Sequence, residues 1–126
     1  MKIAALISRI LLGLVFVVFG LNGFLNFIKG PLPSGVAGQF LGALMQSHFV
    51  FVLSAVELAG GALLLANRYV PLALVLLGPV IVNIFFYHLL MDRSGLIIAI
   101  VVIILWAFIA VRHRQYFSGL FVQRAS

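Results

Sequence analysis

The sequence contains no cysteine and very few charged residues. Its 126 residues include only two acids and eight lysines and arginines, so charged residues make up 8% of the chain, against about 25% in ordinary globular domains. The absence of cysteine excludes disulfides, thiolate metal ligands and thiol catalysis. The shortage of charge excludes a water-soluble fold, because too few polar side chains remain to cover a surface that faces water.

Most of the chain consists of hydrophobic residues. Hydrophobic residues make up 65% of it and the mean hydropathy is +1.32, so the composition predicts a single integral membrane domain over residues 1–126. The net charge of +6 comes from basic residues near the ends of apolar segments. Membrane topology and anionic lipids explain such a distribution better than a nucleic acid, and no nucleic-acid partner is expected.

Four apolar stretches are each long enough to cross about 30 Å of hydrocarbon at about 1.5 Å per residue. The predicted spans cover residues 3–28, 49–66, 70–91 and 96–111. Lys2 precedes the first stretch, as in a signal peptide, but this stretch is far longer than a signal-peptide core. We therefore expect it to be a retained transmembrane helix.

The segment between the first two spans predicts a short extra helix. A Gly/Pro-rich breaker covers residues 30–35, and Ser34 can cap a helix over residues 35–46. Val36, Phe40 and Leu44 recur at helical spacing within it, which is typical of an amphipathic helix at the membrane surface. The predicted fold is all-α: a four-helix membrane bundle with a short interfacial or re-entrant helix between the first and second spans.

The topology follows from the even number of spans and from the basic residues. Short connections at residues 67–69 and 92–95 predict antiparallel neighbours, and four spans place both termini on one side. Six basic residues lie on the side of the termini and two on the other, namely Lys2, Arg9, Arg68, Arg112, Arg114 and Arg124 against Lys29 and Arg93. The positive-inside rule then predicts cytoplasmic termini, with residues 112–126 forming a basic and aromatic tail at the membrane surface.

Glu57 is the most unusual residue of the sequence. It lies midway along the second span, where an acid costs roughly 2.5–3.5 kcal/mol on insertion scales. Polar residues in membranes usually face the interior of the bundle and pair with one another. The spans offer a short set of such residues: Ser8, Arg9, Asn22, Asn26, Ser54, Glu57, Asn83 and His88.

Helical phase predicts which of these residues meet. Arg9 shares a face with Gly13 and Gly20, and Glu57 shares one with Gly60 and Gly61. Because small residues let helix backbones approach closely, we expect the first two spans to pack with Arg9 turned toward Glu57.

Three further residues are expected to extend this polar cluster toward the outer side of the membrane. They are Asn22, Asn83 and Tyr87. Three interpretations remain open: an ion pair that fixes helix register, which we favour; a cavity for a lipid-soluble ligand such as a quinone, with Glu57 or His88 handling protons; and a contact between Glu57 and a partner subunit.

His88 lies near the outer end of the third span. With His48, at similar depth, it offers the two axial ligands of a b-type haem, an alternative that we rank well below the others. Without cysteine and with one deep acid, no metal site is expected.

The order of several short motifs resembles the DoxX-like membrane proteins of bacteria. The first span carries RILLG at residues 9–13 and FGLNG at residues 19–23. The second carries ELAGG at residues 57–61, and the third carries PVIVN at residues 79–83 and YHL at residues 87–89. Each motif is weak alone, and their order and spacing carry the resemblance.

This resemblance implies a four-helix domain of the bacterial inner membrane. The family's Arg and Glu correspond to Arg9 and Glu57, and no residue of a proven catalytic motif carries over. Some relatives are linked to thiosulfate:quinone oxidation or to oxidative-stress complexes, so the implied role is redox-associated.

Three functions are compatible with the sequence. The first is a non-catalytic accessory or structural subunit of a larger, redox-active membrane complex, with membrane lipids and other membrane subunits as partners. The second is a quinone-linked oxidoreductase subunit with a ligand pocket at Glu57, and the third is a module for lipid binding or transport. Quinone and bound lipid are therefore the candidate ligands.

Overall fold

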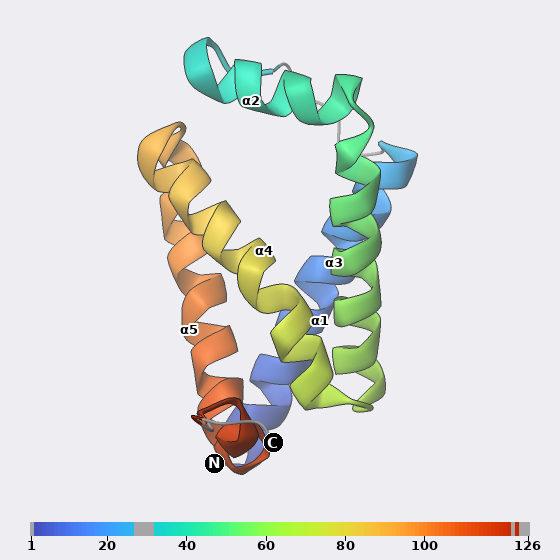
Figure 1. Cartoon of the computed structure of the whole chain (residues 1–126), viewed down its shortest axis with the longest axis vertical. Coiled ribbons are helices and arrows are strands. Elements are labelled where there is room, and N and C mark those ends of the chain that lie inside the picture. Colours follow the sequence, from blue (N-terminus) through green and yellow to red (C-terminus); the bar gives the residue numbers. More distant parts are fainter. Residues whose placement is uncertain (1, 27–31, 122, 124–126) are drawn as a thin grey trace.

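The chain folds into a bundle of long helices closed at one end by a shorter helix (Figure 1). The computed structural model describes residues 2–26, 32–121 and 123. The order of elements is α1 (Lys2–Leu25), α2 (Gly35–Gln46), α3 (Phe49–Ala66), α4 (Val70–Leu90), the 3-10 turn η1 (Arg93–Gly95), α5 (Leu96–Arg112) and the 3-10 segment η2 (Arg114–Phe121).

Among the described residues, four helical segments are long and apolar enough to cross a membrane. They are α1, α3, α4 and the continuous segment of η1 and α5, which runs over Arg93–Arg112. No strand occurs in the described part of the chain. The predicted fold class, an all-α membrane bundle of four helices with a short helix between the first two spans, is confirmed.

The helix boundaries lie close to those predicted, with one correction. Helix α1 ends at Leu25 rather than at residue 28, because Asn26 has a left-handed backbone with φ of 52°. Asparagine tolerates this conformation better than most residues and is a common helix terminator. The last residues of the predicted first span, 27 and 28, lie outside the described residues.

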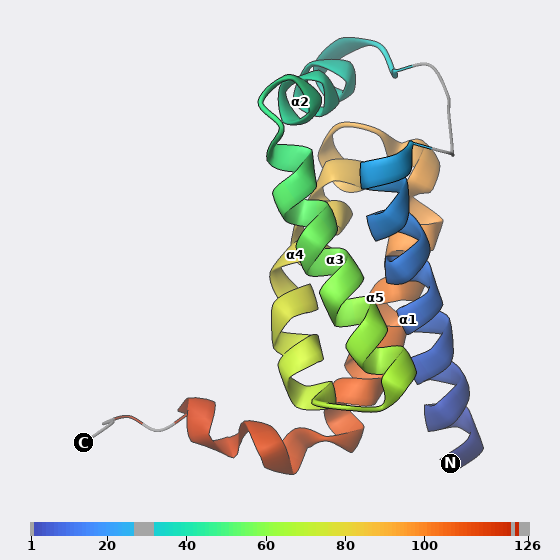
Figure 2. The same cartoon turned by 90° about the vertical axis from the view of Figure 1, so that its right-hand side faces the viewer.

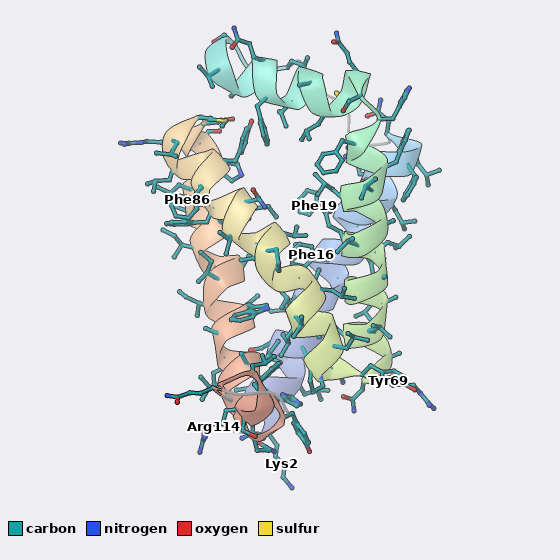
Figure 3. The ribbon with its side chains drawn as sticks, viewed as in Figure 1. Lys2, Phe16, Phe19, Tyr69, Phe86 and Arg114 are labelled. Atoms are coloured by element: carbon teal, nitrogen blue, oxygen red, sulfur yellow. The ribbon has the colours of Figure 1, made fainter. Side chains whose placement is uncertain are left out.

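The four spans form a ring in the order α1, α3, α4, α5. The most extensive helix contacts are those between α1 and α3, followed by α3 with α4, α4 with α5, and α5 with α1. Consecutive spans run in opposite directions, so the start of α1 and the segment η2 lie at the same end of the bundle (Figure 2). Lys2, Tyr69 and Arg114 mark this end, here called the N-terminal end, and α2 closes the opposite one, the α2 end (Figure 3).

Glycines bring the backbones of α1 and α3 into direct contact. A Cβ added to Gly61 would lie 2.8 Å from the backbone of Gly13 and Val17, and one added to Gly20 would lie 2.8 Å from the backbone nitrogen of Leu58. The predicted close approach of the Arg9 face and the Glu57 face is therefore correct. Because the helices are antiparallel, the contact of Gly13 with Gly61 fixes the register of the whole pair.

The hydrophobic core lies mainly toward the N-terminal end. In α4 the buried residues run from Val70 to Ile81, and none of residues 82–90 is buried. Helices α3 and α4 are close together at the N-terminal end and diverge toward the α2 end (Figure 1). The largest fully buried side chains are Leu12, Phe16, Leu64, Leu74, Leu77 and Ile109.

Helix α2 lies across its end of the bundle, nearly perpendicular to the four spans (Figures 1 and 2). The corner between α2 and α3 is made by Ser47 and His48, and His48 takes a left-handed backbone with φ of 64°. The orientation suits a helix at the membrane surface. Its attachment to the bundle is confined mainly to this corner and to a ring contact between Phe40 and Tyr87 of α4.

Candidate functional site

The six residues predicted to form a polar cluster or ligand pocket, His88 included, come from three helices. Arg9 and Asn22 lie on α1, Glu57 on α3, and the other three, Asn83, Tyr87 and His88, on α4. Arg9, Asn83 and His88 each hydrogen-bond to a backbone carbonyl rather than to Glu57.

Arg9 binds the end of α3 rather than Glu57. Its guanidinium donates hydrogen bonds from Nη1 to the backbone carbonyl of Leu64 and to that of Leu65, the latter at 3.3 Å. These carbonyls belong to the last turn of α3, where a helix carries partial negative charge, and the Leu64 carbonyl also accepts from the Asn67 backbone N–H at 3.2 Å. The cation therefore caps a helix C-terminus.

The predicted pairing of Arg9 with Glu57 is wrong. The register explains the difference: Arg9 is one turn from Gly13 and Leu65 is one turn from Gly61, so the contact between the two glycines places Arg9 beside Leu65. Glu57 lies about 12 Å from Leu65 along α3, at about 1.5 Å per residue. Helical phase had correctly identified the shared face, but the two charges lie at different heights on it.

Glu57 remains without a partner inside the described part of the chain. No hydrogen bond or ion pair reaches its carboxylate from any described residue. It lies one turn before Gly60, which packs on Leu77 of α4, and Gly61, which packs on α1. Its side chain therefore projects from the face of α3 that lies between α1 and α4.

The carboxylate of Glu57 is half-buried rather than sealed. No fully enclosed polar side-chain atom among the described residues lacks a hydrogen-bond partner, so the unpartnered carboxylate oxygens keep access to the surface. Glu57 is level with Gly20 of α1, since its neighbour Leu58 packs there. Glu57 therefore lies at the boundary between the buried hydrophobic core and the half of the bundle near α2, where α3 and α4 diverge.

Asn22 and Asn83 lie on different helices. Asn83 is exposed, and its Nδ2 donates to the carbonyl of Pro79 in the same helix, at 2.9 Å. Asn22 is half-buried, and its backbone carbonyl accepts from Asn26 at 2.7 Å, which closes the last turn of α1. The bond within α4 therefore satisfies Asn83 without Glu57.

Tyr87 and His88 belong to the α2 end of α4. His88 donates from Nδ1 to the carbonyl of Asp92 at 2.9 Å, and its ring packs so closely on Gly95 that an added Cβ would lie 2.3 Å away. The Tyr87 ring is 4.9 Å from that of His88 and 5.7 Å from that of Phe40 in α2. Both residues therefore organise the turn after α4 and its contact with α2.

Asp92 caps this turn. Its Oδ1 accepts hydrogen bonds from the hydroxyl of Ser94 at 2.7 Å and from the Ser94 backbone N–H at 3.1 Å. These bonds stabilise the ionised form, so the pKa of Asp92 is held below its usual range. The second acid of the chain is thus fully engaged, in contrast to Glu57.

A cavity that the sequence did not predict lies at the corner of α2 and α3. It is an open surface pocket of about 530 Å³, since every lining residue except Leu44 is exposed, and its lining is apolar except for Ser47 and His48. The cavity is lined by Phe40, Ala43, Leu44, Ser47, His48, Phe49 and Val52. The helical spacing of Phe40 and Leu44 indicated an apolar face on α2, but the corner that turns this face toward α3 depends on the left-handed backbone of His48.

In the described part of the chain, no group of three or more His, Cys, Asp or Glu residues could hold a metal ion.

Comparisons of the chain with protein-family models, with curated proteins and with solved structures find no match.

Proposed function

We propose that this protein is a small, non-catalytic accessory subunit of the bacterial cytoplasmic membrane, which packs against a larger, redox-active membrane assembly. The observation that carries the proposal is the unpartnered carboxylate of Glu57. An acid at this depth is costly unless a donor satisfies it. A donor from a neighbouring subunit would complete the site.

The remaining polar residues support a structural role. Arg9 caps α3, Asn83 binds its own helix, and His88 fastens the turn at Asp92. Each of these side chains is occupied by backbone carbonyls, which leaves none of the three poised toward Glu57. The resemblance to DoxX-like proteins favours a redox-associated partner in the bacterial inner membrane and, with the basic residues at the N-terminal end, cytoplasmic termini.

A second candidate is a quinone-linked subunit that binds its ligand at Glu57. The partial exposure of the carboxylate favours it, because a lipid-soluble ligand could reach Glu57 from the bilayer where α3 and α4 diverge. A quinol hydroxyl would then supply the missing donor. In this case Glu57 handles a proton, and the protein takes part in the chemistry rather than only in assembly.

Purification under native conditions distinguishes the two candidates. The tagged protein is extracted in a mild detergent, and co-purifying proteins and quinones are measured by mass spectrometry. The accessory role predicts a stoichiometric membrane partner that is lost in Glu57→Leu. Ala59→Leu is the matched control, because Ala59 is exposed on the same helix, and it should keep the partner.

The quinone role gives a different result. Quinone should co-purify with the wild type and be lost in Glu57→Gln, with helicity and elution volume unchanged. A wild-type protein that purifies as a lone monomer without quinone would contradict both candidates. Partner binding that survives Glu57→Leu would remove Glu57 from the proposed interface.

A further inference from the structure

The cavity at the corner of α2 and α3 is an open surface pocket whose lining is mostly apolar, with two adjacent polar residues. Hydrocarbon and aromatic side chains line most of it, including Phe40 and Leu44 from α2 and Val52 from α3. Its two polar residues, Ser47 and His48, are neighbours in the turn between the helices. An occupant with a long apolar part and one polar group would match this lining.

The two polar residues, Ser47 and His48, lie at the end of a helix long and apolar enough to span a membrane. Helix α3 is one of the spans and begins at Phe49, immediately after His48, while α2 lies nearly perpendicular to the spans. At the end of a span of this length we expect the turn to lie where phospholipid headgroups meet the acyl chains. The apolar part of the cavity continues from there down the outer end of α3, as far as Val52.

His48 is the one polar side chain of the cavity that remains available. The hydroxyl of Ser47 donates to the Leu44 carbonyl at 3.3 Å and accepts from the Phe49 N–H at 3.2 Å. The ring of His48 stacks on Phe51 at 5.8 Å between centroids, and no described residue hydrogen-bonds to its ring nitrogens. An imidazole N–H is a suitable donor to a phosphate oxygen.

From these features we infer that the cavity is a phospholipid site on the α2 side of the membrane. One acyl chain lies between α2 and α3, and His48 contacts the phosphate. The volume of about 530 Å³ falls within the range of roughly 300–1,000 Å³ for small-ligand sites. A volume of this size suits one chain of a lipid. The site goes beyond the proposed function and does not use Glu57.

The bound lipid stabilises the attachment of α2 to the bundle. Apart from the corner itself, the ring contact of Phe40 with Tyr87 is the main side-chain link between α2 and the span α4. The side chain of Ser34 makes no capping hydrogen bond at the other end of α2. A chain packed against both α2 and α3 adds apolar contact where the protein supplies little.

Filling the cavity tests the inference. The protein is purified in detergent, delipidated, titrated with defined phospholipids and analysed by native mass spectrometry. We expect one phospholipid to bind the wild type preferentially. Affinity should fall by about tenfold or more in Ala43→Trp, whose indole occupies the cavity. Ala62→Trp introduces the same side chain at an exposed position of α3 outside the cavity and should bind as the wild type does.

A second variant guards against misfolding. Val52→Trp fills the cavity from the α3 wall, so a loss of lipid in either folded variant supports the site. The inference is overturned if Ala43→Trp and Val52→Trp are folded and bind phospholipid as tightly as Ala62→Trp, or if the wild type shows no saturable binding.

The headgroup contact has its own test. His48→Ala should weaken binding of phospholipids but leave binding of a neutral diacylglycerol of the same chains unchanged. Equal losses for both ligands would show that His48 acts through the shape of the corner and would refute the phosphate contact. Binding of free fatty acid in preference to phospholipid would assign the cavity to a different ligand and overturn the proposal.

Discussion

Arg9 and Glu57 should act independently on stability, although both are charged residues on facing helices. Arg9→Leu removes the hydrogen bonds from the guanidinium to the carbonyls of Leu64 and Leu65. Hydrogen bonds that involve a charged group contribute about 1.5–3 kcal/mol each. Because one of the two is long at 3.3 Å, we expect a total loss of about 2–4 kcal/mol in the free energy of unfolding.

Glu57→Leu should have a small or favourable effect. The carboxylate has no partner among the described residues, so replacing it removes a desolvation cost without breaking an ion pair. The double variant Arg9→Leu/Glu57→Leu should then equal the sum of the single effects within about 0.5 kcal/mol.

The wild type, the two single variants and the double variant form a double-mutant cycle. Their free energies of unfolding are measured by reversible unfolding in mixed micelles with increasing SDS, followed by circular dichroism. Arg93→Leu is the control, because it removes an exposed arginine whose hydrogen bond, among the described residues, is to the Leu89 carbonyl one turn away. The independence of Arg9 and Glu57 is refuted if the double variant is more stable than the sum of the single effects predicts by more than about 1 kcal/mol. Such a coupling energy would show that the two charges interact and that Arg9 is not simply a helix cap.

Three further predictions concern packing and pH. Gly61→Ala places a Cβ 2.8 Å from the backbone of α1 and should lower the free energy of unfolding by about 1–3 kcal/mol in the same assay. Gly42→Ala is the control, because no atom lies within 4 Å of the added Cβ, and it should be neutral or stabilising. Equal effects of the two variants would contradict the close helix contact. Trp106→Phe removes the indole hydrogen bond of 3.0 Å to α4 and should cost about 1 kcal/mol, with no loss if the bond is absent. The hydrogen bonds from Ser94 lower the pKa of Asp92 in the folded protein, so this contribution to stability is present above the unfolded pKa and is lost as pH falls through the folded one. Ser94→Ala should return that pKa toward its ordinary value in an NMR titration, and an unchanged pKa would exclude the bonds as its cause.

The arrangement of the spans could be predicted from the sequence because hydrocarbon length and breakers determine it. The bounds of α2 and α3 coincide with those predicted, since the Gly/Pro-rich segment precedes α2 and the Asn67 turn follows α3, although the side chain of Ser34 makes no capping hydrogen bond. The end of α1 was placed too late because Ile28 continues the apolar composition, whereas Asn26 ends the helix by its backbone conformation.

The candidate site could be predicted only in part. Periodicity identified Gly13, Gly61 and Glu57 as residues of a contact face, and it gave Arg9 the correct face of α1. It could not give the height of one helix against the other, because many registers bring the same faces together. The contact of Gly13 with Gly61 selects one register, and that choice gives Arg9 the end of α3 as its partner.

The cavity could not be predicted from the sequence, because it depends on how two helices are oriented relative to each other. The apolar face of α2 was visible in the sequence, but its direction depends on the left-handed backbone of His48. A left-handed backbone at a histidine is uncommon, and composition gives little indication of it. The corner therefore emerges only when α2 and α3 are placed in space.

The hydrogen bonds between Arg9 and the end of α3 also have a consequence for the order in which the helices are expected to enter the membrane during synthesis. Arg9 is separated from its first acceptor by 55 residues, so its guanidinium enters or approaches the membrane before its partner has been made. Until α3 is synthesised, an arginine in an apolar helix must keep its charge near the interface or near water. We therefore expect α1 to reach its final depth when α3 joins it, so that the two helices, which form the most extensive helix contact, insert as one unit although α2 separates them in the sequence.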